Sequence, residues 1–581
     1  MQTTKSDVPI DSIGAAGVSD TALRDLLHRH WDQTMERSPT WATMLGDHRF
    51  DDRLSDPSHA ASERWSEQQQ ALLEQAKILD NSAMDANDRV TLRLFEEQLS
   101  RTVERHACQM DLWTISPRDN AYGQVSDLAV NLPPTSDQAR EDLLARYTGI
   151  APYVDTHVIN LRLGLDRGLV ANATSVDKVL EQLERELEQP VQAWPLWQAV
   201  TLAEGPDDDA LQAFSHQIES VLDDQVRPAL ERYVAFLRAD VLPRARPDGE
   251  EGLSALPDGD ICYGVLVRQF TTLPQANAAE RHQLGLDELR SIHDEFRSLG
   301  ARALGTDDLA TIFHRLRTEP SLHFETEQQV EDKARSALAK ARDAMPQWFG
   351  RLPKTECIVE RVPDHEAPYT TIAYYRPPTT DHPGRYNINT YLPETRPRHE
   401  AEVLAFHESI PGHHLQIAIS QELTDLPAFR KHAGMTAFVE GWGLYSERLA
   451  DEMGLYSSDT DRLGMLSFDS WRAARLVVDT GIHSEGWSRA RAEQFLVDNT
   501  PLAKNNIANE VDRYITTPGQ ALSYKTGQLV ISRLRRQAEA DLGDSFDIRA
   551  FHDVVLGAGA VSLPILEERV QAWVQEQKDR K

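Results

Sequence analysis

The stretch RHEAEVLAFHESIPGHHLQIAISQEL, residues 398–423, has the apolar spacing of a helix and carries the polar run HESIPGHH from His407 onward. In the common zinc-binding pattern H-E-x-x-H, two histidines four residues apart lie on one helix face, and the Glu beside the first activates a water molecule. Here the fourth residue after His407 is Pro411, so the usual second ligand is missing. The stretch therefore predicts a helical metal site with altered spacing.

Pro411 has no N–H to donate to the carbonyl of His407, and its ring clashes with that carbonyl, so a regular helix must break or bulge there. In a regular helix His413 would lie about 120° around from His407, and His414 would lie about 10.5 Å along the axis. A bulge at Pro411-Gly412 that absorbs two residues would bring His413 into position. We predict His407 and His413 as ligands, with His414 as the alternative to His413.

An open catalytic zinc site takes three protein ligands, so the third must come from another segment. Glu440, in the helical pattern TAFVEGWGLYSERLADEMG (436–454), is the candidate. Glu447 lies on nearly the same face and is either a backup ligand or the acceptor for a ligand imidazole. Glu408, next to His407, is the predicted general base for one Zn²⁺ per chain.

The next helical pattern places Arg475, Asp479 and His483 four residues apart along one face. Asp479 would orient His483 or a ligand imidazole, while His483 and Arg475 would face the substrate. In PGQALSYKTGQ, Tyr524 would donate to an oxyanion and Lys525, like Arg475, would bind a terminal carboxylate. The alternatives are an internal salt-bridge ladder for the stripe and a half-buried structural role for Tyr524.

Helical spacing dominates from Ser19 onward, which predicts a mainly α protein. A linker rich in Pro, Gly and acid at 244–260 places a soft boundary there. The expected organisation is a flexible N-terminus (1–20), a helical N-terminal lobe (21–250) and a catalytic lobe (251–581), which together form one integrated domain.

Short strands are expected at 355–393, where segments rich in β-branched and aromatic residues are flanked by Pro and Gly. They precede the predicted metal-binding helices at 396–452. Tyr375 and Asn389 lie in these strands, either as substrate-binding residues at the edge of a cleft or as plain sheet residues.

The 581-residue chain holds 61 Lys and Arg against 92 Asp and Glu, a formal net charge of −31. Such a surface repels phosphate backbones and anionic lipid headgroups, which argues against nucleic-acid and membrane partners. A site with Arg475, Lys525, several histidines and a dication would be locally positive, and would favour the carboxylate end of a short peptide.

The three cysteines, Cys108, Cys262 and Cys357, are odd in number and widely spaced, which predicts inert reduced thiols. The first residues show no signal-peptide pattern, and no stretch of about 18 apolar residues occurs. The expectation is a cytoplasmic protein, as a monomer or homodimer.

The motifs HESIPGHHLQ (407–416) and EGWGLYSE (440–447) resemble the two marks of the bacterial family grouped as domain of unknown function 885 (DUF885). The resemblance extends over nearly the whole chain. That family is similar to gluzincin metallopeptidases, which implies a large bilobed helical fold with a small β-sheet beside an active-site cleft. It also implies zinc at His407, His413 and Glu440, with Glu408 as base.

The leading hypothesis is a zinc-dependent hydrolase of short peptides, of carboxypeptidase, dipeptidase or oligopeptidase type. One alternative is a metal-dependent amidase or isopeptidase that acts on a specialised small amide. A third hypothesis, motivated by the missing H-E-x-x-H spacing, is a metal-binding or peptide-binding relative without catalysis.

Overall fold

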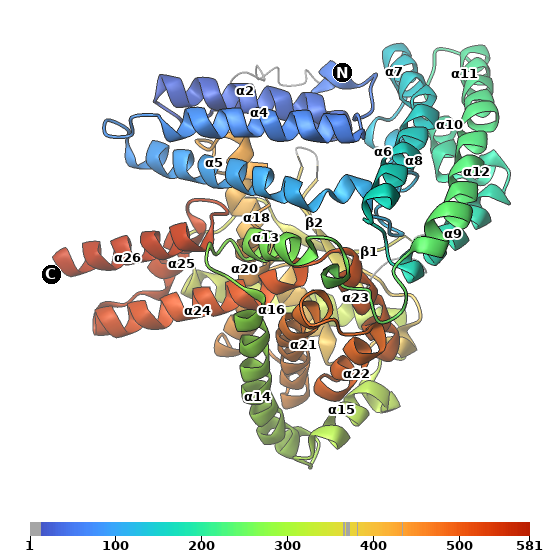
Figure 1. Cartoon of the computed structure of the whole chain (residues 1–581). Helices are drawn as coiled ribbons and strands as arrows, with labels where there is room; N and C mark the ends of the chain where they lie inside the picture. The colour runs from blue at the N-terminus through green and yellow to red at the C-terminus, as the bar shows by residue number, and fades with distance from the viewer. Residues whose placement is uncertain (1–12, 364–366, 368–371, 380–381, 433, 581) are drawn as a thin grey trace. The chain divides into compact units, whose positions relative to one another are not determined.

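The computed structural model describes residues 13–363, 367, 372–379, 382–432 and 434–580. Over these residues the chain is mainly α-helical with one small sheet, as the sequence predicts (Figure 1). Contacts divide it into two compact units: unit 1 is Met1–Cys262 with Pro427–Phe429, and unit 2 is Tyr263–Leu426 with Arg430–Lys581. None of the described helices combines the length and apolar character needed to cross a membrane.

Unit 1 consists of helices joined by short turns. Several begin at a Ser, Asp or Asn whose side chain accepts a hydrogen bond from the first helical turn, for example Asp20 from the amide of Leu23 at 2.8 Å. The helices are α2 (Thr21–Arg37), α3 (Pro39–Met44), α4 (His59–Lys77), α5 (Ala86–Arg105), α6 (Leu128–Asn131), α7 (Asp137–Thr148), α8 (Ile150–Arg167), α9 (Ala173–Leu187), α10 (Gln198–Thr201), α11 (Asp208–Val221) and α12 (Arg227–Phe236).

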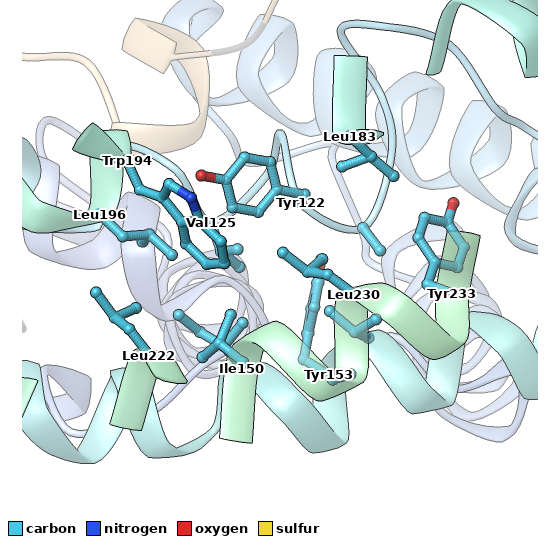
Figure 2. Packing of buried hydrophobic residues seen from close by; sticks show 14 of the residues in the cluster. Tyr122, Val125, Ile150, Tyr153, Leu183, Trp194, Leu196, Leu222, Leu230 and Tyr233 are labelled. Atoms are coloured by element: carbon cyan, nitrogen blue, oxygen red, sulfur yellow. The ribbon is translucent and has the colours of Figure 1, made fainter. Parts of the chain in front are cut away.

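The core of unit 1 follows the helical spacing of apolar residues. On α9, Val176, Val179, Leu180 and Leu183 recur at three- and four-residue intervals and are all buried. Figure 2 shows Leu183 packed in a cluster that also contains the side chains of Tyr122, Val125, Ile150, Tyr153, Trp194, Leu196, Leu222, Leu230 and Tyr233.

The N-terminal segment is more ordered than predicted. Residues 1–12 lie outside the described part, but Ala15 and Val18 are buried. The amide of Ser19 donates a 3.1 Å hydrogen bond to Asp88. The predicted flexible segment 1–20 is therefore too long, because apolar side chains and a buried carboxylate hold its second half.

Unit 2 carries the sheet and the remaining helices, except that α13 and α19 each include residues of both units. The helices are α13 (Gly259–Thr271), α14 (Ala278–Ala303), α15 (Leu309–Thr318), α16 (Glu327–Trp348), α17 (Glu400–Glu408), α18 (His413–Gln421), α19 (Ala428–His432), α20 (Thr436–Glu452), α21 (Asp459–His483), α22 (Arg489–Asn499), α23 (Lys504–Thr516), α24 (Ser523–Leu542), α25 (Ile548–Leu556) and α26 (Leu563–Asp579).

Helix α21 is the central helix of unit 2. Every residue from Leu463 to His483 is buried, so the helix is covered on all sides. It packs along α14, and α17 and α22 also contact it (Figure 1). Helices α20 and α24 form a second close pair, and Gly441 and Gly527 let their backbones approach.

The sheet has three strands in the order β1-β3-β2, with β1 (Cys357–Arg361), β2 (Ala373–Arg376) and β3 (Gly384–Ile388). Strand β1 runs parallel to β3, and β2 runs antiparallel to it. All three strands lie within the predicted range 355–393, so the expected small sheet is confirmed.

The cysteines contradict the prediction of three reduced thiols. Cys108 and Cys262, both in unit 1, form a disulfide with Cα atoms 4.9 Å apart. Cys357 is free and buried, and burial raises its pKa to about 12. Disulfides persist mainly in oxidising compartments, so the cysteines no longer support a cytoplasmic location.

Denatured without reductant, the protein should show one reactive thiol per chain, that of Cys357. Replacing the bonded pair (Cys108→Ala/Cys262→Ala) should lower the free energy of unfolding of unit 1 by about 2–4 kcal/mol, because the uncrosslinked chain gains entropy when it unfolds. Thiol titration and denaturant unfolding measure these effects, and added reductant should not destabilise the double variant further. Three reactive thiols in the absence of reductant would contradict the disulfide.

Candidate metal centre

The helix of the HESIPGHH stretch is broken in the structure. Helix α17 ends at Glu408 and α18 begins at His413, and the Ile410–Pro411 peptide bond between them is cis. A Cβ on Gly412 would overlap the carbonyl oxygen of His407, so this tight connection requires glycine. The break therefore replaces the bulge within a continuous helix that we expected, because Pro411 cannot continue the hydrogen-bond ladder.

A side chain of α20 holds this break in place. The indole Nε1 of Trp442 donates a 2.9 Å hydrogen bond to the carbonyl of Pro411, and both groups are buried. The amide of His414 donates to the carbonyl of Ser409 at 2.9 Å, which starts α18 immediately after the turn. Sequence analysis missed Trp442, although it follows directly after two motif residues, Glu440 and Gly441.

The break brings three potential ligands together. One donor atom from each of His407, His413 and Glu440 lies within 4.8 Å of the others. The Oε2 atom of Glu440 is 3.4 Å from Nε2 of His413 and 3.7 Å from Nε2 of His407. The three residues come from α17, α18 and α20, so the packing of these helices determines the geometry.

These residues fit a tetrahedral zinc ion. Two atoms that each lie about 2.1 Å from such an ion are about 3.4 Å apart, close to the separations in the triad. The buried Oε2 atom of Glu440 accepts no hydrogen bond, which is costly for a carboxylate unless a cation is bound. Burial would raise the pKa of Glu440, but His407 and His413 outweigh this effect and hold it well below its usual value.

Glu447 holds the opposite side of the His407 ring. Its Oε1 lies 2.8 Å from Nδ1 of His407, and its side chain is buried. A carboxylate accepts the Nδ1 proton, which directs Nε2 at the triad. Burial would lower the pKa of His407, but Glu440 and Glu447 outweigh it and raise the pKa to about 9, so Nε2 would give up its proton when it binds a metal ion. Glu447 therefore acts as the acceptor rather than as the backup ligand.

His414 points away from the triad. Its Nε2 lies 3.0 Å from the carbonyl of Thr355, and its Nδ1 lies 2.9 Å from the hydroxyl of Tyr375. Because a carbonyl only accepts, Nε2 carries the proton and Nδ1 accepts from Tyr375. Burial lowers the pKa of His414 to about 4, so the ring is neutral. His414 thus joins α18 to strand β2. The hydroxyl of Tyr375 donates its proton to His414.

Glu408 is half-buried and makes no hydrogen bond or ion pair with the residues that the structure describes. Burial first, and then the nearby Glu408 charge, raise the pKa of Tyr386 on β3 well above its usual value. Glu408 therefore follows directly after a potential ligand and keeps its carboxylate unpaired, which is what a general base needs.

The two cations expected to bind a substrate carboxylate already have partners. Nη2 of Arg475 lies 2.8 Å from Glu510, and Nζ of Lys525 lies 2.7 Å from Asp469 and 3.1 Å from Glu288. Both cationic side chains are buried. The prediction of free carboxylate receptors is therefore wrong for both, because neighbouring helices supply their anions.

The predicted oxyanion donors lie in a cluster formed by α21, α23 and α24. Nε2 of His483 lies 2.9 Å from the carbonyl of Tyr514, and the His483 side chain is fully buried. The hydroxyl of Tyr524 accepts a 3.1 Å hydrogen bond from Arg513, and the guanidinium of Arg475 lies 4.3 Å from the centre of the Tyr524 ring. His483 thus has a structural position, whereas the hydroxyl of Tyr524 donates no hydrogen bond to the residues that the structure describes.

Asp479 orients neither ligand imidazole, contrary to one prediction. It accepts hydrogen bonds from the hydroxyl of Tyr263 at 2.6 Å and from the amide of Gly519 at 3.0 Å. Asn389 also has a structural role: its Nδ2 donates to the carbonyl of Ala367 at 2.7 Å, and its Oδ1 accepts from the amide of Tyr391 at 3.0 Å.

Arg472 is a second residue that sequence analysis missed. It lies three residues before Arg475 on α21, and its Nη2 is 3.9 Å from Oε1 of Glu447. The presence of a second Arg inside an apolar helical run could have identified it. Through Glu447, Arg472 is the nearest arginine to the triad among the described ion pairs.

Replacing His413 by Ala should lower the affinity for Zn²⁺ at least 100-fold, because one of three ligands is lost. The matched variant His414→Ala should retain one Zn²⁺ per chain, since this ring is bonded to Thr355 and Tyr375 instead. Metal analysis after gel filtration and competition with a chelator measure both effects. Equal loss of zinc in the two variants would contradict the assignment of the triad.

Asp479 should make unit 2 less stable as the pH rises. Burial raises its pKa to about 7, against 3.8 for an ordinary Asp, so the folded protein holds a proton that the unfolded chain has lost. The free energy of unfolding should therefore fall between about pH 4 and pH 7, by up to about 1.4 kcal/mol per pH unit. Denaturant unfolding should show that Asp479→Asn removes this fall and that the exposed control Asp498→Asn does not. An unchanged profile in Asp479→Asn would contradict the burial effect.

Comparison with known proteins identifies the family of the chain. A crystal structure described as a “putative lipoprotein” from Colwellia psychrerythraea is 24% identical with a TM-score of 0.88, over 95% of this chain and 99% of that one. A “putative lipoprotein of unknown function” from Shewanella oneidensis is 18% identical with a TM-score of 0.75, over the same shares. At these identities the likeness shows the fold alone, and no curated protein matches. Residues 39–570 match the family described as bacterial protein of unknown function (DUF885), and the chain therefore belongs to that family.

Proposed function

We propose that this chain is a zinc-dependent hydrolase of short peptides in which Glu408 is the general base. The observation that carries the proposal is the triad itself: donor atoms of His407, His413 and Glu440 lie within 4.8 Å, and the buried Oε2 of Glu440 has no hydrogen-bond donor. Such a donor set, two histidines and one carboxylate with an unpaired Glu nearby, is typical of hydrolytic zinc sites.

A zinc ion held by His407, His413 and Glu440 would supply a Lewis acid for a substrate carbonyl and would make a water molecule acidic near neutral pH. Glu408 takes a proton from the attacking water and passes it to the leaving amine. Glu447 keeps the proton of His407 on Nδ1, so that Nε2 stays available as a ligand. We assign donation to the developing oxyanion to Tyr524, whose oxygen accepts from Arg513 and whose proton remains available.

We also propose that the protein works in an oxidising compartment outside the cytoplasm. The disulfide between Cys108 and Cys262 supports this location, because cytosolic thiols are kept reduced. Two proteins of similar fold are described as putative lipoproteins, which agrees with the proposal.

The variant Glu408→Gln tests the proposed function. Turnover of a mixed peptide library should fall about 10²- to 10⁴-fold, because the amide cannot take up the proton, while one zinc per chain should remain bound. The control Glu394→Gln changes an exposed glutamate and should behave as the wild type. Mass spectrometry of the library and metal analysis give the two readouts.

Two outcomes would contradict the proposal. Undiminished turnover in Glu408→Gln would exclude this residue as the base. Stoichiometric zinc in the wild type without hydrolysis of any peptide or branched amide would instead favour a binding protein.

A further inference from the structure

We propose that Arg472 binds the C-terminal carboxylate of the peptide substrate, which makes this protein an enzyme that trims short peptides from their carboxyl end. The inference rests on the proposed function and deepens it by naming the substrate class. Its evidence is the position of one buried guanidinium whose N–H groups are mostly unused.

Aromatic side chains fix the guanidinium of Arg472. Its central carbon lies 4.1 Å from the centre of the Trp471 ring and 4.3 Å from that of Phe468, and only 5% of the side chain is exposed. Cation–π contacts of this kind orient a guanidinium without using its N–H donors. The group is therefore rigidly placed before any ligand binds.

Few of these donors have partners. Nη1 makes one long hydrogen bond, 3.5 Å, to the carbonyl of Phe468, and Nε has no partner. Nη2 lies 3.9 Å from Glu447, which is too far for a hydrogen bond. A buried guanidinium carries five N–H donors, and leaving most of them unsatisfied is costly unless an anion completes the site.

Neighbouring cations of the same helix cluster each have a carboxylate at hydrogen-bond distance. Arg475, one turn later on α21, has a carboxylate at 2.8 Å, and Lys525 on α24 has two carboxylates within 3.1 Å. Arg472 is thus the buried cation of this group that lacks a carboxylate at hydrogen-bond distance. Its planar fork suits a carboxylate, which it would bind through two parallel hydrogen bonds.

The fork also lies close to the proposed reaction centre. Oε1 of Glu447 is 2.8 Å from Nδ1 of His407 and 3.9 Å from Nη2 of Arg472, so one carboxylate separates the guanidinium from a metal ligand. The carboxylate of Glu447 is already paired with the imidazole of His407. Around it, the guanidinium groups of Arg472, Arg475 and Arg513 face the carboxylates of Glu447, Glu510 and Glu400. Glu447 is engaged by His407 and Glu510 by Arg475, so neither is free to serve the fork of Arg472.

The unused donors of Arg472 select the end of the substrate. Inside a protein of net charge −31, an anion binds favourably where a buried cation still has N–H donors without a partner. A free α-carboxylate on Arg472 would lie one glutamate away from the ligand His407. Peptides whose C-terminus is blocked as an amide lack this contact.

The experiment compares one short peptide with a free C-terminal carboxylate with the same peptide as its amide. The wild type should cleave the free acid with a kcat/KM at least about 10-fold higher. Arg472→Gln should reduce kcat/KM for the acid about 10- to 100-fold and reduce that for the amide much less, so that the acid-to-amide ratio falls toward one. Arg472→Lys keeps the charge without the fork and should fall between the wild type and Arg472→Gln. The control Arg462→Gln, whose side chain is 38% exposed on the first turn of α21, should match the wild type.

Binding separates this inference from the proposed function. In zinc-loaded Glu408→Gln protein, calorimetry should show that the acid binds more tightly than the amide and that adding Arg472→Gln removes the difference. If no peptide is hydrolysed, the proposed function fails, and this binding difference still decides the inference. Equal binding or cleavage of acid and amide by protein that retains Arg472 would overturn the inference. An equal loss of kcat/KM for acid and amide in Arg472→Gln would overturn it too. If Arg472→Gln does not fold, a wild-type acid-to-amide ratio in Arg472→Lys would overturn it as well.

Discussion

The centre of unit 2 depends on one imidazole held from both sides. On α20, Glu440 and Glu447 lie two turns apart on one face, and the ring of His407 lies between their carboxylates. Gly443 lies between the two glutamates on the same helix, and a Cβ there would come within 2.7 Å of the His407 ring. The two carboxylates and the space at Gly443 therefore form a seat, that is, a binding position on α20, for the His407 ring. Helix α17 must approach α20 closely to place the ring there.

This seat also determines where the other ligand lies. With His407 fixed, the chain must turn within four residues to place His413 beside Glu440, and the break between α17 and α18 makes this turn. Gly412 allows the turn to touch the His407 carbonyl, and Trp442 on α20 binds the carbonyl of Pro411. The same helix thus supplies a ligand, the acceptor for a second ligand and the support for the third. The triad is consequently a product of helix packing rather than of a single motif.

Local patterns made the triad predictable from sequence, whereas long-range pairing was not predictable. Pro411 excludes regular spacing, and the periodicity of the next helix identified Glu440 and Glu447 together. By contrast, the anions that neutralise Arg475 and Lys525 come from α23, α14 and a distant turn of α21, and no local pattern links them. The disulfide was not predictable either, because its two cysteines are 154 residues apart and no local pattern links them. Composition and spacing describe one helix or strand at a time, whereas the partners of a buried charge come from several helices.

Burial explains why the interior charges differ so much from one another. Arg475 is buried with a carboxylate at 2.8 Å, and the attraction of Glu510 outweighs burial and raises its pKa well above the usual value. Burial lowers the pKa of Arg472 on the same helix, because Glu447 is farther away and is shared with His407. Two arginines one turn apart therefore differ in their anions: Arg475 has a carboxylate at 2.8 Å, whereas Arg472 would gain from an added anion. That difference depends on Glu447. Because its carboxylate is hydrogen-bonded to the ligand His407, it does not pair closely with the guanidinium of Arg472.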